Sequence, residues 1–121
     1  MRTAAYALLA KHVPLLLEHY GVRAVIGKGG MQEEVYQSAF RRHGAIYLTT
    51  VGYGIGAIYG RGIRRVKDVF WKDELGLVQA IWVLEVENFG PFLVECDVEG
   101  RSLFTQANAE VEVTSPMQEM L

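Results

Sequence analysis

Two short apolar segments on either side of a helical pattern most constrain how this chain can fold. Residues 22–27 and 45–51 are mostly apolar and of strand length. Residues 31–42 between them carry acidic side chains at the start and basic ones at the end, which suits the dipole of a helix. Apolar runs of this kind are typical of strands covered on both faces, and a helical connection favours parallel pairing. The first part of the chain therefore predicts two buried parallel strands joined by a helix.

The remaining segments predict further helices and strands around this unit. A helix precedes the first strand, beginning near Thr3 with a kink or near His12, because Pro14 suits only a first turn. Gly21 and Gly44 are expected to end the two helices. The later expectations are a short helix in 52–62, strands at 63–71, 81–87 and 91–97, a turn at 73–77, a hairpin turn at 98–101 leading into 102–104, and a polar C-terminal tail at 105–121.

Together these elements predict one α/β layered domain over residues 1–121 with a mixed sheet. The chain has 121 residues, of which 50% are hydrophobic and 21% charged, as in a globular domain. A net charge of −2 provides no positive field for a nucleic acid. No segment approaches the ~20 apolar residues of a membrane span, and residues 4–10 make a poor signal peptide. We therefore expect a cytoplasmic protein that binds neither nucleic acid nor membrane.

Cys96 is the one cysteine of the chain, which limits its metal chemistry. A single thiol excludes an intrachain disulfide and a self-contained iron–sulfur cluster, and it fits a reducing compartment. We expect Cys96 to pack inside a strand on the same face as Phe92 and Val94. No cofactor is therefore expected in this chain itself.

The loop Gly27-Lys28-Gly29-Gly30 is the main candidate site. Lys28 follows a strand between glycines whose backbone N–H groups can turn inward, and a helix N-terminus follows. A carboxylate or phosphate would suit such a loop, with the amides of Gly29, Gly30 and Met31 close to it. The same residues also fit a glycine turn with a solvated lysine, and the local sequence does not separate these alternatives.

A second glycine pattern follows the second strand. Gly52, Gly54 and Ala57 fit G-x-G-x-x-A, the dinucleotide-binding fingerprint, which is informative only between a strand and the helix of a β–α–β unit. Further glycines at Gly56, Gly60 and Gly62 favour close helix packing over a phosphate-binding loop. His12 and His19 lie seven residues apart, without further residues at metal-ligand spacing.

Several longer strings resemble one family of enzymes. Residues 21–31 (GVRAVIGKGGM), 42–52 (RHGAIYLTTVG), 80–91 (AIWVLEVENFGP) and 97–104 (DVEGRSLF) appear in the order found in the β subunit or C-terminal domain of the iron–sulfur hydro-lyases. That family includes class I fumarase and L(+)-tartrate dehydratase. The resemblance covers residues 11–104.

The resemblance implies a swivelling β/β/α fold and a partner. The family's α subunit holds a 4Fe–4S cluster, and the β domain helps to bind a small dicarboxylate to which water is added or from which it is removed. Lys28 matches the lysine that binds the dicarboxylate, with Gly29 and Gly30 beside it. Leu8 stands where the family has a substrate-binding arginine, so the chain resembles a β domain lacking its first strands.

Three functions follow as expectations. The first is the β component of a fumarase or tartrate dehydratase type hydro-lyase, inactive without its α partner. The alternatives are a non-catalytic binding or assembly homologue and, on Gly52 to Ala57, a nucleotide-binding domain. We also expect a homo-oligomer, because strand edges and apolar faces left uncovered tend to pair. The apolar segment around Ile55 and Ile58 is a plausible contact.

Overall fold

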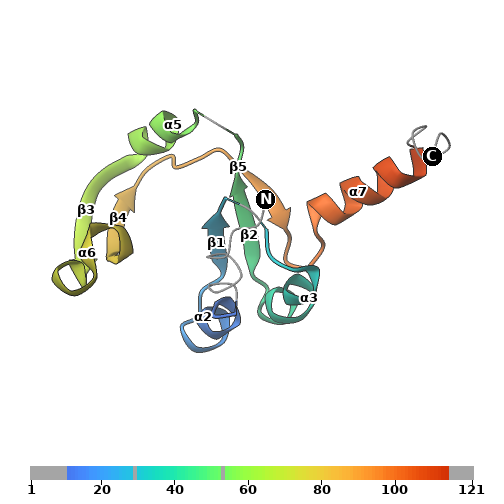
Figure 1. Cartoon of the computed structure of the whole chain (residues 1–121), viewed down its shortest axis with the longest axis horizontal. Helices are drawn as coiled ribbons and strands as arrows, with labels where there is room; N and C mark the ends of the chain where they lie inside the picture. Colours follow the sequence, from blue (N-terminus) through green and yellow to red (C-terminus); the bar gives the residue numbers. More distant parts are fainter. Residues whose placement is uncertain (1–10, 29, 53, 115–121) are drawn as a thin grey trace. The chain divides into compact units, whose positions relative to one another are not determined.

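The computed structural model describes residues 11–28, 30–52 and 54–114, which belong to two compact units. Unit 1 lies within residues 1–50 and 92–121, and unit 2 is residues 51–91. Figure 1 shows the elements of both units. No helix of the described ranges is long and apolar enough to cross a membrane.

Unit 1 contains a three-stranded mixed sheet. Strand β1 (Ala24–Gly27) pairs in parallel with β2 (Ile46–Thr50), and β2 pairs antiparallel with β5 (Phe92–Cys96), giving the order β1-β2-β5. The parallel crossover at the start and the antiparallel pairing at the end are both confirmed. The α/β class with a mixed sheet is therefore confirmed.

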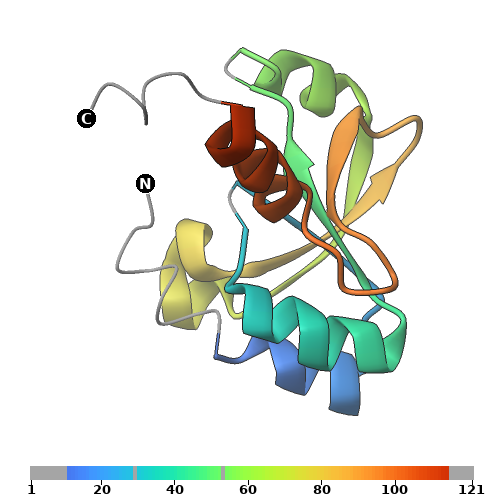
Figure 2. The same ribbon diagram turned by 90° about the vertical axis from the view of Figure 1, so that its right-hand side faces the viewer.

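Two helical segments lie side by side in unit 1 (Figure 2). The first is α2 (Val13–His19), in which Pro14 occupies the first turn. The second runs through α3 (Glu33–Val35), the π-helical segment η1 (Tyr36–Phe40) and α4 (Arg41–His43). Gly44 ends it with φ +60°, a left-handed conformation that glycine adopts without a steric penalty, as predicted.

These helices bury one face of the sheet around an aromatic cluster. The rings of Tyr36, Phe40 and Tyr47 lie 5.3–6.2 Å apart at tilted or edge-to-face angles, which is favourable for aromatic pairs. Leu17 and Met31 also contribute to this core. The fully buried strands expected from composition are not found. Successive side chains of β2 alternate between buried and half-buried, because both helices pack on the same face.

Cys96 is fully buried, as expected, but it does not share a face with Val94. The register between β2 and β5 shifts between Tyr47 and Leu48, so that Cys96 lies opposite Tyr47 and Val94 opposite Leu48. This bulge breaks the alternation of the strand. Glu95 and Cys96 are therefore both buried, whereas Val94 is exposed.

The end of unit 1 differs from the sequence prediction. The expected turn forms, because Asp97 accepts hydrogen bonds from the backbone N–H groups of Glu99 and Arg101. Only an isolated bridge between Cys96 and Ser102 follows, however, and helix α7 (Leu103–Thr114) begins there. The expected tail is thus helical to residue 114, and residues 115–121 lie outside the described residues. Figure 1 shows α7 extending away from the sheet.

Unit 2 is a two-stranded ribbon with two helices. It consists of α5 (Gly56–Arg61), β3 (Ile63–Phe70), α6 (Lys72–Gln79) and β4 (Ile81–Val86). Strands β3 and β4 pair antiparallel, and both were predicted, as was α5. The turn predicted at 73–77 is confined to Gly76. Gly76 interrupts the helical backbone with φ +81°, but the segment remains helical on both sides.

The apolar side chains of unit 2 are exposed in both strands and in α6. Trp82 donates a hydrogen bond from Nε1 to the carbonyl of Leu77, and Tyr59 donates one to the carbonyl of Pro91. The first contact joins β4 to α6, and the second joins α5 to the segment after β4. The exposed large apolar residues of unit 2 are Val51, Ile58, Ile63, Val66, Phe70, Trp71, Leu75, Leu77, Val78, Ile81, Trp82, Val83, Leu84 and Val86.

Candidate functional site

The loop that carries Lys28 leaves the carboxyl end of β1, where the sequence predicts an anion site. The Lys28 side chain is exposed, Gly30 is half-buried, and Gly29 lies outside the described residues. The loop returns at once to the core, because Met31 is buried in the aromatic cluster. Lys28 is therefore a solvent-exposed cation on a short loop between two anchored ends.

Two buried polar side chains lie directly behind this loop. The Met31 backbone N–H donates a hydrogen bond of 2.8 Å to Tyr36 Oη, and Tyr36 Oη donates one of 2.8 Å to Glu95 Oε1. Tyr36 and Glu95 are 1% and 3% exposed. Burial raises the pKa of the Tyr36 phenol well above its ordinary value, so the phenol remains protonated and can donate. A directional chain of hydrogen bonds thus runs from the loop to strand β5.

Gly30 contacts the carboxyl group of Glu95 so closely that no side chain fits there. A Cβ placed on Gly30 would overlap Glu95 Oε1 and lie 2.9 Å from Tyr36 Oη. Glycine is required here for close approach, a requirement that the local sequence does not reveal. The loop is therefore packed against the buried pair on its inner side.

The environment of the loop differs from the expected anion site in two ways. The Met31 amide is bonded to Tyr36, so the expectation that it faces a bound anion is wrong. The helix begins at Glu33 rather than Met31, and Glu33 and Glu34 carry negative charge in its first turn. Acidic side chains satisfy the positive end of a helix themselves. The attraction for an anion at this loop consequently rests on Lys28.

Tyr36 and Glu95 were not identified from the sequence. Their side chains meet across 59 residues of chain, and no local pattern reveals such a contact. One signal was available, because Glu95 is an acidic residue in the otherwise apolar strand FLVEC. A carboxylate is rarely buried in a strand without a specific partner.

The second glycine pattern lacks the structure that nucleotide binding requires. Gly52 and Gly54 do follow β2, and Ala57 lies in α5. The next strand, β3, pairs antiparallel with β4 instead of returning parallel to β2. A dinucleotide site needs that β–α–β crossover, so the nucleotide-binding interpretation is not supported.

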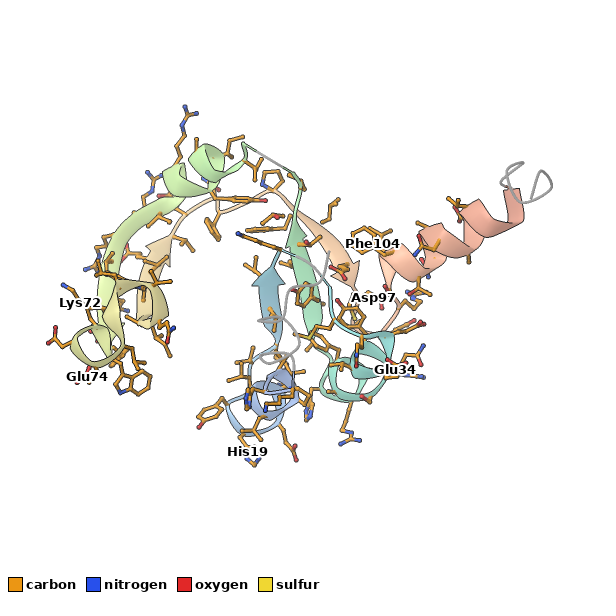
Figure 3. The ribbon with its side chains drawn as sticks, in the orientation of Figure 1. His19, Glu34, Lys72, Glu74, Asp97 and Phe104 are labelled. Atoms are coloured by element: carbon orange, nitrogen blue, oxygen red, sulfur yellow. The ribbon has the colours of Figure 1, made fainter. Side chains whose placement is uncertain are left out.

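The histidines do not gather with other potential ligands. His12 and His19 lie at opposite ends of α2 (His19 is labelled in Figure 3), and both are exposed. Among the residues that the structure describes, no group of three or more His, Cys, Asp or Glu side chains could hold a metal ion.

A polar groove of about 390 Å³ lies in unit 1, between the α3–η1–α4 helix and the start of α7. Asp97 and Phe104, labelled in Figure 3, mark the segment that forms one of its walls. None of the predicted site residues lines it. Its lining residues are Glu33, Gln37, Arg41, Glu99, Gly100, Arg101, Ser102, Thr105 and Gln106.

The Lys28 loop lies in a region of the chain that matches a known protein family. Residues 4–107 match the family model described as the fumarase C-terminus. The chain belongs to this family. The match includes β1, the Lys28 loop, the helix behind it and β5. The resemblance to β subunits and C-terminal domains of hydro-lyases is therefore confirmed.

Named relatives carry two activities. The chain is 40% identical over 90 residues to a protein of Methanocaldococcus jannaschii provisionally named an L(+)-tartrate dehydratase subunit beta, with 74% of this chain and 45% of that protein covered. It is 38% identical over 88 residues to a Geobacillus stearothermophilus protein provisionally named a class I fumarate hydratase, covering 73% and 16%. The Escherichia coli L(+)-tartrate dehydratase subunit beta is 29% identical over 90 residues, covering 74% and 43%. The chain spans less than half the length of each relative.

Proposed function

We propose that this chain is the β component of a hydro-lyase that adds water to, or removes it from, a small dicarboxylate. Family membership and the names of the tartrate dehydratase and fumarate hydratase relatives support this proposal. The observation that carries it is Lys28, which lies exposed on a glycine loop inside the matched region. Its ammonium group can pair with one substrate carboxylate.

The proposal requires an α partner that carries a 4Fe–4S cluster. When bound there, the cluster supplies a Lewis-acidic iron for the substrate hydroxyl. This chain cannot supply the thiolates, because Cys96 is fully buried. Burial, with smaller contributions from Asp97 and Glu95, raises the pKa of its thiol to about 12. The role of this chain is therefore to bind and orient the dicarboxylate, and we place it in the reducing cytoplasm.

Anaerobic reconstitution tests the proposal. The chain is mixed with a matching cluster-bearing α subunit, and turnover of fumarate and of tartrate is followed, with each component alone as control. We expect a complex whose activity depends on both components and is lost in Lys28→Ala but retained in Lys72→Ala, which removes an exposed lysine of unit 2. Absence of a complex and of turnover would contradict the proposal.

A non-catalytic binding or assembly homologue is the second candidate. It is favoured by one feature of the sequence, because Leu8 stands where the resembling enzymes have an arginine for a substrate carboxylate. Reconstitution separates the two candidates. A stable complex that binds dicarboxylate and shows no turnover would support the second.

We also propose that the chain self-associates. The support is the exposed apolar surface of unit 2, which includes Val78 at 96% exposure and Leu77 at 60%. Apolar patches of this kind mark interaction surfaces. Light scattering at micromolar concentration should give at least twice the 13.5 kDa of one chain, and Val78→Glu should reduce the mass. A wild-type mass of one chain would contradict this.

A further inference from the structure

We propose that Tyr36 and Glu95 are positioning residues that hold the Lys28 loop in the conformation needed to bind a carboxylate. The inference rests on the proposed function for the role of Lys28. Its structural part, the bracing of the loop, rests only on contacts among described residues. Neither residue is assigned a role by the family match or by the names of the relatives.

The two hydrogen bonds of Tyr36 run in one direction, from the Met31 backbone to Glu95. A phenol has one O–H to donate and oxygen lone pairs to accept with. Tyr36 donates its proton to Glu95 Oε1 and accepts a hydrogen bond from the Met31 N–H. The two hydrogen bonds use different groups of the phenol and can therefore form together. Burial makes both contacts costly to lose, because an unpaired buried polar group is strongly destabilising. The backbone at Met31 is consequently fixed at the start of the helical segment.

Gly30 packs directly against the Glu95 carboxyl group. The Glu95 carboxyl group occupies the space where any side chain at residue 30 would lie. The loop therefore cannot collapse toward the core while Glu95 remains in place. Glu95 and Tyr36 thus hold Gly30 and Met31 on the side of the loop that faces the core. The Lys28 side chain remains exposed to solvent, where a ligand can reach it.

Tyr36 and Glu95 both come from irregular segments of backbone. Tyr36 begins the π-helical turn η1, and Glu95 lies in β5 beside a strand irregularity. π-Helical turns and bulges redirect side chains and are frequent at functional sites. Both departures from regular structure thus bring polar side chains to the same loop.

Amide hydrogen exchange in the full chain tests the bracing directly. Tyr36→Phe removes the hydroxyl, and Glu95→Met keeps the length of the side chain while removing both acceptor oxygens. We expect the amides of Lys28, Gly30 and Met31 to exchange about tenfold faster in both variants, relative to those of β2. Tenfold corresponds to about 1.4 kcal/mol.

Phe40→Leu is the matched control, because Phe40 packs edge-to-face on Tyr36 but takes no part in the hydrogen bonds that join Met31, Tyr36 and Glu95. It should lower stability and leave the ratio of loop to β2 exchange unchanged. If Tyr36→Phe fails to fold, Glu95→Met decides the question. Unchanged loop exchange in a folded variant, or the same change in Phe40→Leu, would overturn the bracing.

Titration with malate then separates this proposal from the proposed function. We expect Tyr36→Phe to reduce the initial slope of the malate-induced chemical-shift changes about tenfold, again as the effect of about 1.4 kcal/mol. Lys28→Ala should remove them. If Lys28→Ala has no effect, the proposed function fails. If Lys28→Ala removes binding while Tyr36→Phe binds like wild type, the positioning role fails alone.

Discussion

Unit 1 and unit 2 contain similar proportions of apolar residues but bury them to different extents. In unit 1, two helical segments and two strands surround a cluster that includes Leu17, Tyr36 and Phe40, all at most 1% exposed. In unit 2, both strands and α6 leave their large apolar side chains exposed. Every buried hydrophobic side chain in the described part of the chain belongs to unit 1.

The difference indicates which part of the molecule can position a site by itself. A two-stranded ribbon with neither face covered is marginal in water, whereas a sheet covered by helices has a core. Lys28, Tyr36 and Glu95 all belong to unit 1. The candidate site therefore depends on the unit with its own core, and unit 2 is the part expected to gain most from another chain.

Truncation of one large side chain in each unit gives the largest expected contrast. Phe40→Ala should lower the free energy of unfolding by about 3–5 kcal/mol, because it leaves a cavity in a packed core. Val78→Ala should change it by less than about 0.5 kcal/mol, as for exposed substitutions. Urea denaturation at a concentration where the chain is monomeric measures both. Equal losses in the two variants would contradict the contrast.

Alanine at one glycine of each unit should give effects of opposite sign. Gly30→Ala places a methyl group on the Glu95 carboxyl group and should destabilise by about 1–3 kcal/mol, as overpacking does. Gly60→Ala, in helix α5 with open space around it, should stabilise by about 0.5–1 kcal/mol. Thermal unfolding compares them. A neutral Gly30→Ala would show that Glu95 does not pack on the loop.

Alkaline pH should weaken unit 1 through its buried thiol. Burial raises the pKa of Cys96 from 9.0 to about 12. As the pH rises, the Cys96 thiol therefore ionises in the unfolded chain before it ionises in the folded chain. The contribution of the neutral thiol to the free energy of unfolding is complete below pH 9 and is lost as the pH rises toward 12. Cys96→Ala should remove the loss of stability that begins near pH 9. It should retain the loss of stability that begins near pH 10, where Tyr36 ionises in the unfolded chain. Denaturation between pH 8 and 11 measures this, and identical profiles would contradict it.

The ion pairs of unit 2 should have the smallest effect. Arg65 Nε lies 2.7 Å from Glu85 Oε2, but both side chains are at least half exposed. Exposed pairs contribute about 0–1 kcal/mol and weaken with salt. Arg65→Ala should therefore change unfolding by less than about 1 kcal/mol at low salt and by less still at high salt. A loss above this range would show that the ribbon is held by charge.

The sequence predicted those elements whose signals are local. Apolar runs placed β1 and β2, and Gly44 marked the end of the helix between them. The helical spacing of Val35 and Ala39 predicts that both face inward, and both are partly buried against the core. Tyr36 and Phe40 contribute more, but the helical pattern did not select them. The π-helical segment shifts the periodicity on which such selection depends.

Other elements were missed because the pattern was read too simply. The polar stretch after Thr105 is rich in good helix formers, and Ser102 accepts a hydrogen bond from the Thr105 N–H at its start. The break at Leu75-Gly76 was predicted, but the helical segments on either side of Gly76 were not. The Tyr36–Glu95 contact could not have been predicted, since only the folded sheet and helix bring these residues together.

The affinity of the full chain for malate, with and without Lys28, tests the central claim most directly. We expect millimolar binding or weaker for wild type, because each charge-assisted contact that an α partner would add is worth about 1.5–3 kcal/mol. Lys28→Ala should abolish this binding and change stability by less than about 0.5 kcal/mol, since Lys28 is exposed on a loop. Lys72→Ala should bind malate like wild type. Equal binding by Lys28→Ala, or its unfolding, would show that Lys28 is a solvated or structural residue and not a substrate contact.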